Sequence, residues 1–325
     1  MFEITKKNIR IWSRLGPSGA LGVAAMELAE RNPKTVMLTS DLCFFSGLER
    51  YKKEYSDRLY NFGIAEQNMI GVAAGMAKEG LIPFATTYAS FATSRCMDQV
   101  RVNMSYMQLP IKLIGLTAGF GAGILGATHI SIEDISIMRA VPGITIIAPA
   151  DCTEIIKAIM AVAEAPGPAY IRLTGPVNTP LVYQEDYEFK IGKAVKLRSG
   201  SDVCLIASGS IVHEVLEATK FLEKDQISCS VINMHTIKPL DIEMLDNVMK
   251  THSLLVTIEE HNIFGGLGSA IAEYISDKKE RLPLLKIGVN DRFPSAGDYH
   301  YQLEETGLTA EQISTKIKKF IYNEK

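Results

Sequence analysis

The sequence is poor in cysteine, and its few cysteines are scattered. The 325 residues contain five, at Cys43, Cys96, Cys152, Cys204 and Cys229, with no C-x-x-C pair among them. An odd number at this spacing predicts neither a disulfide framework nor a zinc site. Free thiols are typical of a reducing compartment, so the pattern favours the cytoplasm.

Long apolar runs and strong net charge are also missing. No apolar stretch reaches the roughly 18 residues of a membrane span, and the first residues, MFEITKKNIRIWSR, lack the apolar centre of a secretory signal. A net charge of −3 provides no positive field for nucleic acid or an anionic membrane surface. What remains is a globular chain, 47% hydrophobic and 22% charged, long enough for two domains.

Short apolar runs alternate with helical patterns along the first half of the chain. Strands are expected over 35–41, 81–88, 111–117, 144–150 and 168–174, and helices over 68–80, 91–107, 132–141 and 151–165. Because the strands are continuously apolar and separated by helices, the pattern predicts a parallel sheet covered on both faces.

A second alternating unit follows a stretch rich in turn residues and mixed charge. Its expected strands are 202–209, 228–235, 254–260 and 282–289, with helices over 212–225, 241–252 and 264–277. The sequence therefore predicts an α/β protein of two doubly wound domains, 1–178 and 193–325, joined by a linker over 179–192.

The segment GAGILG at 121–126 fits the pattern G-x-G-x-x-G of a dinucleotide-binding turn. It follows an expected strand, but the glycines come after at least two strands and no helix begins at them. The next acid after the following strand, Asp151, is a candidate helix N-cap. We therefore expect a flexible glycine-rich loop rather than a nicotinamide site, and His129 becomes its residue of interest.

Several longer motifs resemble one family in order along nearly the whole chain. They are FGIAEQNMIGVAAGMAKEGLIPFATTYASFATSRCMDQVR (62–101), ATHISIEDISIMRAVPGITIIAPAD (127–151), GPAYIRL (167–173), INMHTIKPLD (232–241) and EEHNIFGGLGSAIAE (259–273). They resemble the transketolase family of thiamine-diphosphate enzymes, and most closely the C-terminal subunit of split, two-chain transketolases. The resemblance implies a pyrimidine-binding domain followed by a transketolase C-terminal domain.

The resemblance also implies roles for particular residues. Glu66 matches the carboxylate that hydrogen-bonds the cofactor's aminopyrimidine, and Phe91 matches its stacking partner, with Tyr88 beside it. Asp41 matches an acid at a strand end that faces the cofactor, and His129 matches a histidine that contacts substrate oxygens. Taken alone, Glu66 could be an ordinary first-turn acid, Asp41 a turn residue, and the two aromatics core residues.

The chain lacks the G-D-G turn and asparagine with which the family holds diphosphate and a divalent metal. The resemblance therefore implies a separate N-terminal subunit that supplies most of the thiamine-diphosphate and Mg²⁺ site, in an α2β2 assembly. No metal ligand is assigned to this chain. A homologue without activity is a third possibility, against which the retained Glu66, Phe91 and His129 argue.

The expected substrate loop departs from members that act on sugar phosphates. Those members have a histidine at Thr117, an acidic pair near Ile124 and Leu125, and arginines near Ser18 and at Gly175. Losing these charged groups leaves phosphate without partners, so we expect substrates other than the standard pentose phosphates.

An alternative is a dehydrogenase E1β-type, acyloin-synthase or deoxyxylulose-phosphate-synthase-like subunit that uses a 2-oxoacid donor such as pyruvate. In the second domain, His261 is expected to be structural and Arg292 to lie at an interface.

Overall fold

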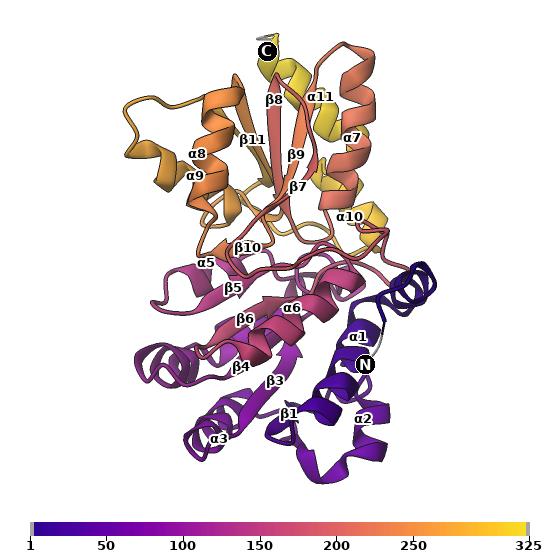
Figure 1. The fold of residues 1–325 in the computed structure, drawn as a ribbon, viewed down its shortest axis with the longest axis vertical. Coiled ribbons are helices and arrows are strands. Elements are labelled where there is room, and N and C mark those ends of the chain that lie inside the picture. Colours follow the sequence, from indigo (N-terminus) through magenta and orange to yellow (C-terminus); the bar gives the residue numbers. More distant parts are fainter. Residues whose placement is uncertain (1–2, 323–325) are drawn as a thin grey trace.

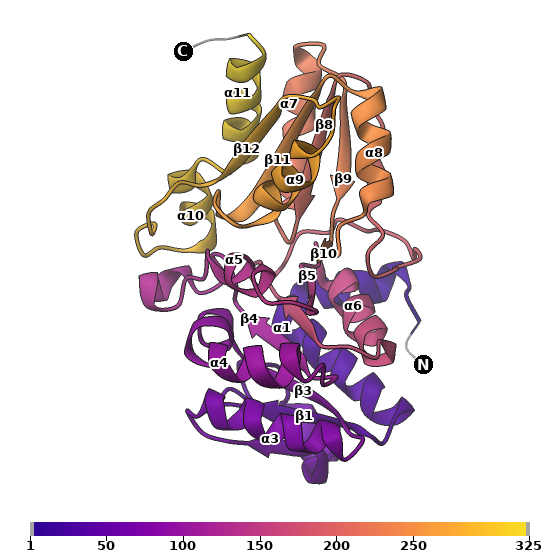
Figure 2. The same ribbon diagram turned by 90° about the vertical axis from the view of Figure 1, so that its left-hand side faces the viewer.

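The computed structural model describes residues 3–322 and forms two α/β units stacked along the long axis of the molecule (Figure 1). One sheet has seven strands in the order β10-β5-β6-β4-β3-β1-β2, and the other has five in the order β12-β11-β8-β9-β7. The chain's first half forms the lower unit in Figures 1 and 2, and its C-terminal end lies far from the first sheet.

The first sheet is built mainly from parallel strands whose side chains are buried on both faces. Its strands are β1 (Thr35–Thr39), β2 (Leu59–Asn61), β3 (Ile82–Tyr88), β4 (Lys112–Leu116), β5 (Thr145–Ile147), β6 (Ala169–Arg172) and β10 (Thr236–Lys238). Alternation divides the central strand β1 between two cores: Val36 and Leu38 pack on one face and Met37 on the other. Every residue of β1 is buried, as expected of a central parallel strand.

Helices cover both faces of this sheet. One core contains side chains of α1 (Lys6–Arg31) and α6 (Cys152–Glu164), and the other contains those of α3 (Glu66–Lys78) and α5 (Asp134–Arg139). The sequence analysis did not predict α1. It bends at Gly16, whose φ of 74° breaks the helical pattern before Pro17.

The second unit is also an α/β unit, with a smaller sheet of five strands. Its strands are β7 (Val195–Arg198), β8 (Val203–Ser208), β9 (Cys229–Asn233), β11 (Leu254–Asn262) and β12 (Leu284–Val289). Its helices are α7 (Val212–Lys224), α8 (Ile242–Thr251), α9 (Leu267–Ser276), α10 (Tyr299–Thr306) and α11 (Ala310–Ile321). Figure 1 shows α11 lying beside α7, where both helices contribute to one apolar core.

Two expectations need correction. The predicted helix over 91–107 consists of π-helical turns, Phe91–Arg95 and Val100–Tyr106, separated by the short α4 (Met97–Gln99). The first sheet is also not purely parallel. Strand β10, from the second half of the chain, pairs antiparallel with β5.

The proposed boundaries at 178 and 193 stay a prediction, with β10 as one element that crosses between units. The remaining elements of the described chain are α2 (Glu49–Glu54) and short 3₁₀ turns at Ser56–Arg58 and Gly123–Thr128. Among residues 3–322, no helix has the length and apolar character needed to cross a membrane.

Candidate functional site

A pocket of about 310 Å³ lies at the carboxyl edge of the first sheet. Its lining residues come from the segments that follow β1 and β3 and from the start of α3: Ser40, Asp41, Leu42, Ile64, Glu66, Tyr88, Phe91 and Arg95. We call it the Glu66 pocket. It brings together four residues expected from the sequence, because neighbouring parallel strands end at the same edge.

Glu66 is the first residue of α3, and its side chain is 2% exposed. Its Oε1 accepts hydrogen bonds from Arg95 Nη1 at 2.8 Å and from Thr87 Oγ1 at 3.4 Å. Its Oε2 is buried and has no hydrogen-bond partner among the residues that the structure describes. A buried polar atom without a partner is costly, so Oε2 is available to a bound ligand.

Arg95 was not singled out from the sequence, yet it is the one cationic side chain among the eight that line the Glu66 pocket. Its guanidinium lies over the Phe91 ring, 3.8 Å from the ring centroid. It ends the π-helical turn that begins at Phe91, and such turns are frequent at functional sites. One planar cation therefore contacts both Glu66 and Phe91.

The His129 ring packs against two aromatic rings that line this pocket, Tyr88 and Phe91. The His129 ring lies 5.3 Å from the centroids of both Tyr88 and Phe91, and the two aromatic rings lie 5.8 Å apart. His129 Nδ1 is 2.9 Å from Thr128 Oγ1. Burial raises the pKa of the Tyr88 hydroxyl. The structure thus places His129 beside the predicted aromatic pair, although 38 residues separate it from Phe91 in sequence.

Asp41 follows β1 in a left-handed conformation, with φ of 58°. Its backbone N–H donates to Asn61 Oδ1 at 2.9 Å, and Asn61 Nδ2 donates to Asp41 Oδ1 at 3.4 Å. Aspartate tolerates this conformation better than most residues. The exposed carboxylate is held at the rim of the Glu66 pocket.

The second domain holds the glycine-rich loop that carries His129. Glu260, at the end of β11, accepts a hydrogen bond from the backbone N–H of Phe120 at 2.6 Å. Its other oxygen accepts from Ser210 Oγ at 2.9 Å and from Tyr299 OH at 2.6 Å. Burial is the main cause that raises the pKa of Glu260. No feature of the sequence singled out this residue.

The same loop does not begin a helix at its glycines. Gly123–Thr128 form a 3₁₀ turn, and α5 starts only at Asp134. A dinucleotide site would need a helix N-terminus facing the phosphates, so the dinucleotide alternative is not supported. Leu125 is 49% exposed on this turn and does not line the Glu66 pocket.

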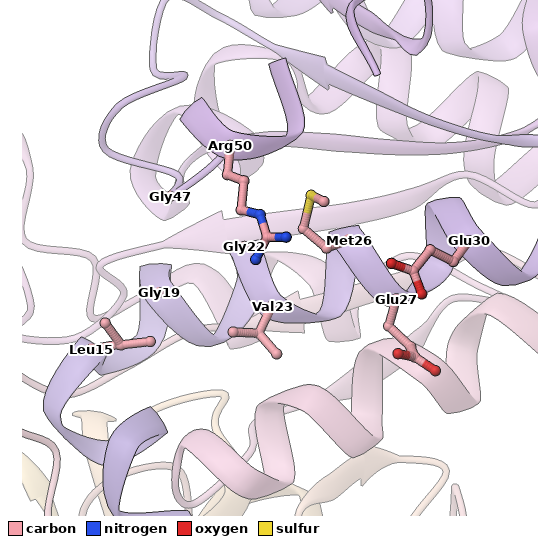
Figure 3. A pocket seen from close by; sticks show the side chains of 9 residues that line it. All are labelled: Leu15, Gly19, Gly22, Val23, Met26, Glu27, Glu30, Gly47 and Arg50. Carbon is pink, nitrogen blue, oxygen red and sulfur yellow. The ribbon is translucent and has the colours of Figure 1, made fainter. Parts of the chain in front are cut away.

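Thr117 lines a separate small pocket on the same edge of the sheet, together with Ser18 and Gly175. A larger pocket of about 430 Å³ lies elsewhere, where Arg50 reaches from α2 toward α1 (Figure 3). It is lined by Leu15, Gly19, Gly22, Val23, Met26, Glu27, Glu30, Gly47 and Arg50, and contains none of the expected site residues. Within residues 3–322, no three His, Cys, Asp or Glu side chains cluster as a metal site.

The two second-domain residues noted in the sequence lie outside these pockets. His261 is fully buried, and desolvation lowers its pKa to about 4. The Nη1 atom of Arg292 donates to Glu305 Oε1 of the same chain at 2.9 Å. A structural role for His261 is consistent with this burial, and an interface role for Arg292 stays a prediction.

Both halves of the chain match models of known protein domains. Residues 17–176 match the model of the transketolase pyrimidine-binding domain, and residues 192–313 match that of the transketolase C-terminal domain. A putative transketolase C-terminal section of Methanocaldococcus jannaschii is 38% identical over 91% of this chain and 93% of that protein. The chain belongs to the transketolase family.

Two further relatives are subunits of two-chain members of the family. The 6-deoxy-6-sulfo-D-fructose transketolase subunit SqwH of a Clostridium strain is 40% identical over 89% of each chain. A solved split-gene transketolase, described as an inactive β4 tetramer, has a TM-score of 0.84 at 37% identity and covers 94% of this chain and 97% of its own. The printed descriptions of these two relatives therefore name a subunit in one case and a tetramer in the other.

The 2-oxoacid alternative is not favoured. A 1-deoxy-D-xylulose-5-phosphate synthase of Synechococcus is 34% identical, but the chain spans only 47% of it. The family depends on thiamine diphosphate, and the Glu66 pocket fits part of that molecule. It offers an aromatic face at Phe91 and a buried, unpartnered carboxylate oxygen at Glu66, which suit an aminopyrimidine ring.

Proposed function

We propose that this chain is the pyrimidine-binding half of a thiamine-diphosphate-dependent enzyme that moves a two-carbon ketol unit between sugar-like substrates. The observation that carries the proposal is the buried, unpartnered Oε2 of Glu66 in a pocket that also presents Phe91. In the family's chemistry, the bound cofactor supplies the carbon nucleophile that accepts the two-carbon unit.

Individual residues of this chain bind the cofactor or the substrate. Glu66 would bind the ring nitrogen of the aminopyrimidine through its buried, unpartnered Oε2 and share a proton with it. Phe91 stacks on the ring and Tyr88 closes its edge. Asp41 orients the cofactor from the rim. His129, beside the Tyr88 and Phe91 rings, donates a hydrogen bond to the substrate oxygen on which negative charge develops.

The diphosphate and a magnesium ion are assigned to an N-terminal partner subunit, in an α2β2 heterotetramer. Support comes from the apolar side chains around the Glu66 pocket, since Phe44, Phe45 and Ile64 are 66%, 54% and 79% exposed. Exposed apolar side chains clustered at a site are typical of protein interfaces. Thr117 and Leu125 belong to the substrate side of the assembled site.

The substrates are sugars other than the standard pentose phosphates. One relative of comparable length is named for a sulfonated fructose, and another, from Phocaeicola vulgatus, for apulose 4-phosphate. We place the reaction in cytoplasmic carbohydrate metabolism, in accord with the scattered free cysteines.

Calorimetry tests the assignment directly. Thiamine diphosphate with Mg²⁺ is titrated into this chain alone, and then into its complex with the proposed N-terminal subunit. We expect tight binding only to the complex. Equal affinity for the isolated chain would show that the diphosphate is held here and would overturn the division of the site.

Replacing Glu66 tests the chemistry. Glu66→Gln in the assembled enzyme is expected to lower kcat at least 100-fold with the subunits still associated, because an amide cannot exchange the proton. Glu79→Gln, at the other end of α3, is the matched control. Full activity of Glu66→Gln would remove this residue from the mechanism.

A further inference from the structure

Two of the three glycines in the segment GAGILG pack against a segment of the second domain. A Cβ at Gly123 would lie 2.6 Å from the carbonyl oxygen of Gly297, which is closer than real side chains allow. Gly126 has a positive φ of 69°, and a Cβ there would lie 3.5 Å from that of Ala296. The glycine pattern therefore reflects a close contact between this 3₁₀ turn and the second domain.

The contacting residues 295–297, which we call the 295–297 segment, are held by one side of α10. The carboxylate of Glu305 accepts from the backbone N–H of Ser295 at 2.8 Å and from its Oγ at 3.2 Å. Gln302 Nε2 donates to the carbonyl oxygen of Ser295. Because Gln302 and Glu305 are three residues apart in a helix, their side chains reach the segment from the same side. Helix α10 thus holds both backbone polar groups of Ser295.

Arg292 keeps the Glu305 carboxylate ionised. Its Nη1 atom donates to Glu305 Oε1, and this hydrogen bond lowers the pKa of Glu305. At neutral pH the carboxylate therefore accepts from Ser295 and from Arg292 together.

The 295–297 segment passes this support on to the loop that carries His129. The backbone N–H of Gly297 donates to the carbonyl oxygen of Gly123 at 3.2 Å. Within the turn, the carbonyl oxygen of Gly126 accepts from the backbone N–H groups of His129 and Ile130, both at 3.0 Å. The place of the turn therefore sets the backbone from which the His129 side chain projects.

The turn has few other means of staying in place. Its two large apolar side chains, Ile124 and Leu125, are exposed, so little apolar burial holds it. The hydrogen bonds described within it, such as that from Leu125 N–H to the carbonyl of Ala122, join near neighbours in sequence. Contact with the second domain is therefore what fixes the turn relative to the first sheet.

From these contacts we infer that Glu305 is a positioning residue, which sets the place of His129 through Ser295 and the 3₁₀ turn. The inference rests on the proposed role of His129 in two-carbon transfer. It adds a second attachment of this loop to the second domain, separate from the contact of Glu260 with Phe120. A merely structural Glu305 would affect stability and leave the rate unchanged.

Hydrogen exchange of the assembled enzyme tests the placement of the turn. Glu305→Ala removes the acceptor for Ser295, and we expect the backbone amides of His129 and Ile130 to exchange roughly 10-fold faster. Glu304→Ala, at the exposed preceding residue of the same helix, should leave both rates within about 2-fold of wild type. Unchanged exchange in Glu305→Ala would overturn the inference.

Kinetics tests the consequence for the reaction, with β-hydroxypyruvate as donor and glycolaldehyde as acceptor. The bond between the donor's carbonyl carbon and its carboxylate breaks, and CO₂ leaves. A bond to the aldehyde carbon forms, and the aldehyde oxygen takes up a proton to give erythrulose. We expect Glu305→Ala to lower kcat about 10-fold with little change in cofactor affinity, because small displacements of a reacting group are costly. Glu305→Gln should recover most of the rate, since its carbonyl oxygen still accepts from Ser295.

The two measurements separate the inference from the proposed function. Faster exchange with an unchanged kcat in Glu305→Ala, while His129→Ala is impaired, would overturn the inference and leave the proposed function standing. A wild-type rate in His129→Ala would instead overturn the role of His129, on which the inference rests. Absence of turnover in the wild type with cofactor bound would overturn the proposed two-carbon transfer, and the exchange rates would still decide whether Glu305 places the turn.

Discussion

At the scale of single residues, Arg95 occupies the aromatic face that a bound aminopyrimidine would also need. Its guanidinium lies over Phe91 and donates to Glu66 Oε1, which leaves Oε2 without a partner. A ring that stacks on Phe91 must displace the guanidinium from that face, and Arg95 is 41% exposed to water. A cation–π contact at an exposed site contributes about 0.5–1 kcal/mol.

Removing the guanidinium should therefore ease cofactor entry. We predict that Arg95→Met increases the affinity of the assembled enzyme for thiamine diphosphate by up to about 5-fold, the equivalent of 1 kcal/mol. Calorimetry on the complex measures it, with Arg101→Met as an arginine control outside the pocket. A weaker affinity in Arg95→Met would mean that the side chain holds the cofactor instead of competing with it.

His129 is expected to act on the substrate and not on the cofactor. His129→Ala should lower kcat by about 10²- to 10³-fold, the range for loss of one preorganised hydrogen-bond donor, while cofactor affinity changes little. Steady-state kinetics and cofactor titration give the two values, and His213→Ala on α7 serves as control. Loss of cofactor binding would show that the imidazole supports the aromatic rings.

Individual site residues could be predicted only where a motif carried them. Glu66, Phe91 and Asp41 stand in stretches with a family likeness, and the structure brings their side chains to one pocket. Arg95 was missed because an arginine after a small-residue run gives no local signal. Its importance comes from a π-helical turn that directs it back to Glu66. Leu125 was placed in the substrate loop, but its contact with substrate stays untested.

At the scale of elements, the loop that carries His129 depends on the second domain. Glu260 holds the backbone of Phe120, and the adjacent Gly119 packs so closely that a Cβ there would lie 2.2 Å from Glu260 Oε1. Gly119 also has a positive φ of 61°. Both the close contact with Glu260 and this backbone conformation therefore disfavour a side chain at position 119. The second domain thus fixes one end of the loop.

We predict that Glu260→Ala lowers kcat at least 10-fold without changing cofactor affinity, and that Glu260→Gln recovers most of the activity. The glutamine carbonyl can still accept from Phe120 N–H, whereas alanine leaves that donor unsatisfied. Kinetics and cofactor titration separate the two effects. Equal rates in all three proteins would show that the loop needs no support from β11.

The element order was largely predictable from apolar periodicity, but some elements were not. The helix α1 was missed because Gly16 and Pro17 interrupt its pattern, although its side chains share a core with those of α6. Strand β10 is only three residues long, and its antiparallel pairing with β5 depends on how the two units pack. Local sequence carries no signal for such tertiary pairing.

At the scale of the whole molecule, buried ionisable groups make stability depend on pH. Desolvation lowers the pKa of His261 from 6.5 to about 4. A group whose pKa is depressed on folding contributes stability above its unfolded pKa, and that contribution is lost as pH falls from 6.5 to 4. At pH 5, which is 1.5 pH units below the pKa of His261 in the unfolded chain, the free energy of unfolding is lower by about 2 kcal/mol.

The neighbouring Glu259 acts in the opposite direction. Burial raises its pKa from 4.5 to about 7, so its effect favours the folded state as pH falls through this range. Comparing wild type with His261→Gln isolates the effect of the histidine on the pH dependence of stability, because Glu259 is present in both proteins. We predict that wild type loses about 2 kcal/mol more than His261→Gln between pH 7.5 and 5.

Urea unfolding at the two pH values measures the difference, and His300→Gln is a surface control. Parallel losses in wild type and His261→Gln would show that His261 titrates equally in the folded and unfolded chain. The same measurement on the assembled enzyme would show whether the partner subunit changes this balance.

The exposed side chains of Phe44, Phe45 and Ile64 have a consequence for how the protein is produced. A cell that synthesises this chain in excess of its partner leaves the three side chains open to water, where they favour self-association. A split-gene relative is described as an inactive β4 tetramer. If the proposed partner subunit covers these side chains, balanced production of the two chains would matter as much as the fold.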